Sequence, residues 1–185
     1  MKNFFDLFFE SIGEDKNRVG LLNTPKRVIE SWNRLYSGYK MDSNELFANA
    51  FCDENYKDLI LLKNIEFYSM CEHHLLPFFG KISIGYIPNG KLIGVSKLID
   101  LVEIFSKRLQ IQERLTKQIA DSIDLNLAPK GVMVLVEATH LCALMQGREK
   151  SNATFVTNEK RGIFTEKESR AEFFHLLNRE ENHSK

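Results

Sequence analysis

The chain has 185 residues, of which 43% are hydrophobic and 27% charged, a composition typical of one globular domain with a substantial core. Lysine plus arginine and aspartate plus glutamate balance at 25 each, so no overall charge favours nucleic acid or a membrane surface. Charged residues interrupt the apolar start, which argues against a signal peptide, and no stretch has the roughly 18 apolar residues of a spanning helix. We expect a cytoplasmic protein with one domain, residues 1–185.

Helical spacing of apolar residues predicts two helices near the start of the chain, within residues 1–40. The first covers residues 2–12. The second begins with Thr24 as N-cap and Pro25 at the first helical position, and Gly38 ends it. We expect the two helices to pack together as an N-terminal pair.

The middle of the chain changes to the alternating pattern of β-strands. A dipeptide of asparagine and glycine in this region is a strong signal for a hairpin turn. The predicted elements are strands over 59–70 and 81–87, a hairpin at Asn89-Gly90, and a β-rich run over 131–138 whose partner lies within 140–157.

Apolar residues recur at helical spacing over 97–109 and 112–125, and Thr165 with Glu168 forms a capping box that opens a final helix. Strands grouped around a helical pair, with helices at both ends, predict an α+β fold. Residues 57–178 would form an antiparallel sheet with two helices packed on one face. Because the edge strands of such a sheet must be covered or paired, we expect an oligomer.

Two short clusters carry the chemistry of the chain: Cys71-Glu72-His73-His74 and His140-Leu141-Cys142. An odd, low number of cysteines argues against a disulfide framework and favours metal binding or reactivity. A catalytic zinc is held by three protein ligands and keeps a fourth position for water, and the two clusters can supply three. Spacing alone leaves open which of the adjacent histidines is the ligand.

His140 and Cys142 lie two residues apart on a predicted strand, so both side chains should face the same side. If Cys142 binds a metal, His140 faces the same cavity, and its imidazole titrates in the right range to move protons for a zinc-activated water. The alternative is that the clusters are unrelated core or surface residues. Two such clusters on neighbouring strands favour zinc.

Three further features predict a substrate pocket, and each has a purely structural alternative. Ser96 and Lys97 begin a helix, where an anion is favoured, or they are simply a cap and a solvated lysine. A carboxylate at the start of the next helix could hold paired N–H donors of a guanine edge, or could only complement the helix dipole. The third feature is Arg27, which is either a phosphate contact or a surface arginine. The five candidate residues are Ser96, Lys97, Gln112, Glu113 and Arg27.

Four stretches closely resemble GTP cyclohydrolase I, a family with the tunnelling fold, and the resemblance runs from Thr24 to the final helix. The Cys-Glu-His-His and Gln-Glu-Arg-Leu stretches, in this order, are highly specific. The resemblance implies that subunits close into a β-barrel, that two pentamers stack into a homodecamer, and that active sites lie between subunits. The four stretches are residues 71–80, 94–97, 110–115 and 137–142.

The resemblance also implies a reaction. Cys71, His74 and Cys142 would bind Zn²⁺, and the activated water would attack C8 of GTP, releasing formate and forming 7,8-dihydroneopterin triphosphate, the first step of tetrahydrofolate or other pterin biosynthesis. His140 matches the histidine that protonates the imidazole nitrogen, and His73 matches the second catalytic histidine. The implied substrate contacts are Gln112 and Glu113 at the guanine edge, and Ser96, Lys97 and Arg27 around the ribose and triphosphate.

Two positions depart from the family's pattern. Gln146 and Asp100 stand where arginines that would contact triphosphate are common. An arginine offers a charge-assisted fork to phosphate, whereas an aspartate repels it. Lys97, Arg27 and the nearby Arg148 or Lys150 are the cations that could compensate. Two alternatives stay open: a non-catalytic paralogue that keeps the fold and the metal, and an enzyme acting on a purine or pterin with fewer phosphates.

Overall fold

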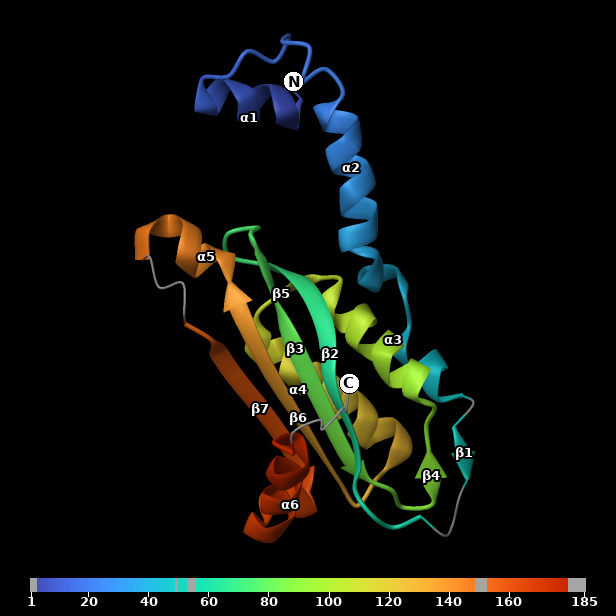
Figure 1. Ribbon diagram of the computed structural model, residues 1–185. Coiled ribbons are helices and arrows are strands. Elements are labelled where there is room, and N and C mark those ends of the chain that lie inside the picture. The colour runs from blue at the N-terminus through green and yellow to red at the C-terminus, as the bar shows by residue number, and fades with distance from the viewer. Residues whose placement is uncertain (1–2, 49, 53–55, 149–152, 180–185) are drawn as a thin grey trace, which may run out of the picture.

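A five-stranded sheet forms the centre of the protein, seen in a computed structural model that describes residues 3–48, 50–52, 56–148 and 153–179 (Figure 1). Its strand order is β5-β2-β3-β6-β7, and β1 and β4 form a separate two-stranded sheet. The α+β class is therefore confirmed. The strands are β1 (Phe51–Cys52), β2 (Ile60–Cys71), β3 (Pro77–Ile87), β4 (Lys91–Leu92), β5 (Leu109–Gln110), β6 (Gly131–His140) and β7 (Phe155–Gly162).

Each neighbouring pair among β2, β3, β6 and β7 is antiparallel, as predicted, but β5 is parallel to β2. The hairpin prediction is wrong, because β4 pairs with β1 and not with β3, although Gly90 does adopt a left-handed turn conformation with φ of 84°. The partner of β6 also lies later than predicted. The chain after His140 turns into helix, so the pairing strand starts at Phe155.

Helices α3 and α4 cover one face of the sheet, which confirms that part of the prediction (Figure 1). Their buried side chains and the facing strand residues make the main core. Helix α6 packs on the opposite face, where Phe173 and Phe164 meet Met133 and Leu135 in a second, smaller core. The helices of this body are α3 (Val95–Ser106), α4 (Gln112–Leu127), the short α5 (Leu141–Ala143) and α6 (Lys167–Leu177).

The burial pattern along the strands follows from these two layers. In β2, residues from Ile65 to Ser69 alternate between buried and exposed, as expected for a strand with one covered face. In β6, every residue from Gly131 to Val136 is buried, because α4 lies on one side and the α6 core on the other.

The predicted N-terminal pair exists and stands away from the sheet (Figure 1). It consists of α1 (Phe4–Ile12) and α2 (Thr24–Leu35), and Trp32 of α2 contacts Phe4 and Phe5 with ring centroids 6.0 and 6.1 Å away. Thr24 is not the N-cap: it is the first helical residue, and its hydroxyl donates to the carbonyl of Gly20.

Two further helix starts differ from prediction by a residue or two. Helix α3 begins at Val95 with Gly94 as its cap, so Ser96 lies inside the first turn. Helix α6 is capped by Glu166, and the hydroxyl of Thr165 donates to the carbonyl of Gly162 in the preceding turn. In both cases the serine or threonine has a nearby backbone acceptor or solvent instead of a cap position.

No helix among the described residues is long and apolar enough to cross a membrane.

Candidate active site

The first cluster lies on the tight turn that joins β2 to β3. Cys71 is the last residue of β2, and its backbone N–H donates to the carbonyl of Leu76 at 2.9 Å. Leu75 closes the turn with a left-handed φ of 52°, and its N–H donates back to the carbonyl of Cys71. This geometry holds His73 and His74 at the end of the sheet, beside β5.

The second cluster comes from the chain after β6. His140 ends the strand, and Cys142 lies in the short helix α5. The prediction that both residues share a strand is therefore wrong for Cys142. Both side chains nevertheless line the same cavity, because the helix begins directly after His140 and turns Cys142 back toward the β2–β3 turn.

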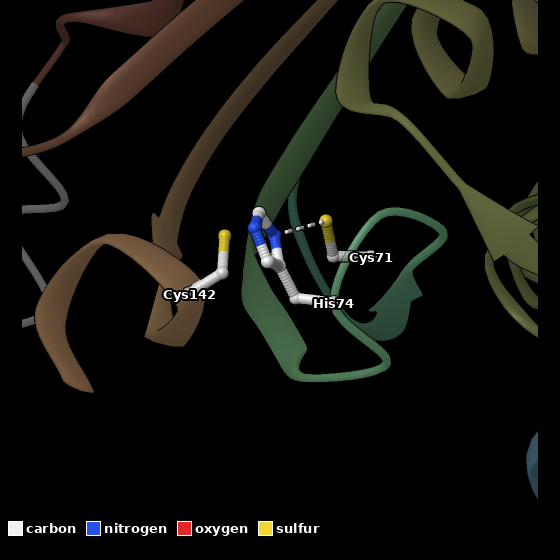
Figure 2. A group of neighbouring side chains, drawn as sticks. All are labelled: Cys71, His74 and Cys142. Atoms are coloured by element: carbon white, nitrogen blue, oxygen red, sulfur yellow. Dashed lines mark hydrogen bonds between the residues drawn. The ribbon is translucent and has the colours of Figure 1, made fainter. Parts of the chain in front are cut away.

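Three side chains meet where the clusters face each other. The ligand atoms of Cys71, His74 and Cys142 all lie within 4.8 Å of one another, and Cys71 Sγ is 3.9 Å from His74 Nδ1. Figure 2 shows the His74 ring between the two sulfur atoms. Two cysteine sulfurs and an imidazole nitrogen favour zinc, because magnesium and calcium prefer oxygen ligands. The residues present fit a zinc ion with three protein ligands.

Electrostatics around Cys142 agree with that fit. Burial, and after it the neighbouring Cys71 thiol, raises the pKa of the Cys142 thiol. Such a thiol resists losing its proton unless a cation neutralises the thiolate, and a divalent metal does this directly. The site is therefore better suited to a bound cation than to a free thiolate nucleophile.

His140 lies on the same side of the cavity and is held by two aromatic rings. Its ring stacks on Phe78 with centroids 4.6 Å apart, and the ring of Phe155 meets it edge-on at 5.6 Å. Burial lowers the pKa of His140, and the charge of Glu113 opposes that shift only in part. That shift favours the neutral imidazole, and its Nε2 lies 2.8 Å from Oε1 of Gln112.

The cavity has a volume of about 440 Å³, within the range of small-molecule sites. His73 and Glu113 also line it. His73 is mostly exposed, and Glu113 lies in the first turn of α4, where the helix dipole favours a carboxylate. The structure thus brings together seven of the predicted site residues: Cys71, His73, His74, Gln112, Glu113, His140 and Cys142.

Three predicted contacts do not line this cavity. Ser96 and Lys97 lie at the β4 end of α3, whereas the cavity lies at the end near β5 (Figure 1). From Lys97 to the other end of α3 is roughly 14 Å along the helix. Lys97 pairs with Asp100 at 3.8 Å, and Arg27 is exposed on α2. Within one chain these residues are separate from the Cys/His cluster.

Sequence reasoning missed an ion pair that joins two parts of the site. Both terminal guanidinium nitrogens of Arg114, Nη1 and Nη2, donate to the Glu72 carboxylate, at 2.5 and 3.0 Å. The pair links the β2–β3 turn to the first turn of α4, and the hydrogen bond from Arg114 lowers the pKa of Glu72. Both residues stand inside the motifs, beside Cys71 and Glu113, so their proximity to the site could have been expected.

Comparison with known proteins gives one consistent result. Residues 1–178 match the GTP cyclohydrolase I family. The chain is 56% identical over 178 residues to GTP cyclohydrolase 1 of Helicobacter acinonychis, covering 96% of this chain and 99% of that protein. It is 57% identical over 156 residues to GTP cyclohydrolase 1 of Wolinella succinogenes, covering 84% of this chain and 83% of that one.

Among solved structures, archaeosine synthase QueF-Like in the apo form matches with a TM-score of 0.46 and 19% identity, covering 56% of this chain and 93% of that one. The sequence matches extend over nearly the full length and include the turn, the helix start and the strand end that build the cavity. The chain belongs to the GTP cyclohydrolase I family.

Proposed function

We propose that this protein is a zinc-dependent, cytoplasmic GTP cyclohydrolase that hydrolyses GTP at C8, releases formate and forms 7,8-dihydroneopterin triphosphate for tetrahydrofolate or related pterin synthesis. The observation that carries the proposal is the meeting of Cys71, His74 and Cys142 in one cavity with His140 and Glu113. Membership of the family supplies the reaction, and the cavity contains the groups that this reaction needs.

Each group has a distinct task. Zinc, when bound by the Cys71, His74 and Cys142 side chains, supplies a Lewis acid that activates water at neutral pH. His140, neutral and held by its neighbours, exchanges a proton with the imidazole nitrogen of the guanine. His73 lies on the open side of the cavity and serves as the second proton carrier. The two oxygens of Glu113 accept the adjacent N–H donors of the guanine's pyrimidine edge.

We propose a homodecamer of two stacked pentamers, in which neighbouring subunits complete the site. Ser96, Lys97 and Arg27 would then contact the ribose and triphosphate of GTP bound in another subunit's cavity. Their distance from the cavity of their own chain supports this arrangement. Large apolar side chains that stay exposed on α1 support association of subunits as well, namely Phe4, Leu7, Phe8 and Ile12.

Formate release from GTP by metal-analysed protein tests the proposal. We expect turnover that follows zinc content, and Cys142→Ala should lose both. Cys52→Ala is the matched control, because Cys52 belongs to the separate β1–β4 sheet. His140→Ala should keep zinc but slow ring opening. A fully zinc-loaded protein that releases no formate from GTP would refute the proposal, and zinc retained stoichiometrically by Cys142→Ala would refute the ligand set.

A further inference from the structure

The side chain of Gln112 is the most completely engaged polar group beside the cavity. Gln112 is fully buried, with 0% exposure. Its Nε2 donates to the carbonyl oxygens of Val136 and Phe155, at 3.0 and 2.9 Å, and to the hydroxyl of Thr157 at 3.1 Å. Its Oε1 lies 2.8 Å from Nε2 of His140. Because both the nitrogen and the oxygen of this amide already have hydrogen-bond partners in the protein, the side chain is poorly placed to hydrogen-bond to a guanine.

These partners fix which end of the amide is which. The two carbonyl oxygens can only accept, so a reversed amide would place oxygen against oxygen. Thr116 donates its hydroxyl hydrogen to the backbone carbonyl of Gln112 at 2.7 Å. The hydroxyl of Thr157, 2.6 Å from that of Thr116, must then donate to Thr116 and accept from Gln112. The amide has two N–H hydrogens for three acceptors, so one hydrogen is shared between two of them, and the oxygen end of the amide still faces His140.

The orientation of the Gln112 amide determines the tautomer of His140. Because Oε1 of Gln112 can only accept, the facing Nε2 of His140 must carry a hydrogen. The ring stacks on Phe78 and meets the edge of Phe155, and Nε2 is the ring nitrogen that lies 2.8 Å from the amide oxygen. In the neutral imidazole the lone pair is therefore on Nδ1.

We propose that Gln112 is a positioning residue that holds His140 as the Nε2–H tautomer, so that Nδ1 is the atom that exchanges a proton with the substrate. This inference rests on the proposed function for its catalytic meaning, but not for the tautomer itself. It also reassigns Gln112, which the family resemblance placed at the guanine edge, to contact with the catalytic histidine. Glu113, the next residue, keeps the guanine contact.

Two measurements test this assignment. The first is ¹⁵N NMR of protein labelled in its histidine rings, with the His140 signals identified by their loss in His140→Ala. We expect a protonated Nε2 and an unprotonated Nδ1 in the neutral ring. The measurement needs no GTP and no variant of Gln112, so it holds even if Gln112 variants fold poorly or the protein acts on another substrate. A neutral ring protonated at Nδ1 would overturn the inference.

The second measurement separates kcat from KM for GTP in Gln112→Met, a substitution of similar size that cannot hydrogen-bond to His140. Loss of the correct tautomer should lower kcat about 100-fold, as general acid–base catalysis is worth 10²–10⁴-fold, and should leave KM within about threefold. A rise in KM with kcat retained would instead indicate direct contact with the guanine, and unchanged turnover would indicate no role; either result overturns the inference.

Tyr86→Phe is the matched control for Gln112→Met. It also removes a buried hydrogen bond, the one that the Tyr86 hydroxyl accepts from the backbone N–H of Ile93 at 3.3 Å. Tyr86 does not line the cavity, so kcat should stay within about twofold of the parent. If the control lost as much kcat as Gln112→Met, general destabilisation would explain both losses and the inference would fail.

Discussion

Gly80 is a position where one added methyl group should strongly destabilise the sheet. It lies in β3 opposite Ala138 of β6, and a Cβ built on it would come 1.9 Å from the carbonyl oxygen of Glu137. A Cβ atom essentially never lies within 3.0 Å of a backbone oxygen, so the two strands would have to separate by about 1 Å. A backbone hydrogen bond of about 2.9 Å does not survive that displacement.

Gly80→Ala should therefore break about two ladder hydrogen bonds. Each is worth about 1 kcal/mol net, and up to about 3 kcal/mol where a buried group is left unpaired, so we expect a loss of about 2–4 kcal/mol. Because His140 follows Ala138 by two residues on β6, turnover of GTP should fall too. Urea unfolding at fixed protein concentration and formate release measure the two effects.

Gly20→Ala is the control for this substitution. There the nearest atom to an added Cβ, at 2.9 Å, is the end of the flexible, exposed Arg18 side chain, which can move away. We expect a change below about 0.5 kcal/mol. If the free energy of unfolding of Gly80→Ala also lay within about 0.5 kcal/mol of the parent's and turnover were unchanged, the close approach of β3 and β6 would not constrain this position.

Two further predictions concern parts of the fold outside the cavity. Phe173→Ala should cost about 3–5 kcal/mol, because the ring is fully buried against Phe164 under α6; thermal unfolding would show it, while zinc binding below the transition should persist. Asp121 is the pH-dependent case: burial would raise the pKa of its carboxyl, but hydrogen bonds from Lys117 and Arg161 outweigh burial and lower it. Its stabilisation is therefore present above about pH 4 and lost below. Asp121→Asn should cost at most about 1 kcal/mol at pH 7, and a difference from the parent that does not shrink by pH 3 would contradict this.

The sequence allowed the layers of the fold to be predicted because apolar periodicity reports which faces are buried. Helices α3 and α4 and strands β2, β3 and β6 all coincide with predicted segments, with ends shifted by a few residues. Pairing partners were harder to predict. The asparagine–glycine turn is a local signal, but β4 joins β1 through contacts that are distant in sequence. A local sequence signal cannot show which strand a short strand such as β4 pairs with.

The site was predictable to the extent that its residues lie in short motifs. Cys71 and His74 share one turn, and that turn fixes their relation. Cys142 was placed in the same cavity for a reason that proved wrong, since it lies on a helix and not on a strand. The network around Gln112 depends on the carbonyl of Phe155, 43 residues away, and on the register of β7 against β6. Such a contact has no local pattern, so sequence reasoning left Gln112 at the substrate.

The two positions that depart from the pattern of the resembled family lie outside the lining of the cavity that contains the proposed metal ligands. Asp100 lies on α3 and pairs with Lys97, while Gln146 is exposed on the π-helical turn that follows α5. Neither lines the cavity that holds Cys71 and His140. If subunits meet as proposed, we expect a change of charge at Asp100 or Gln146 to alter the KM for GTP, because an arginine binds phosphate and an aspartate repels it. The proposed metal ligands and His140 lie on β2 and the turn after it, at the end of β6 and on α5, so they are other residues than these two positions.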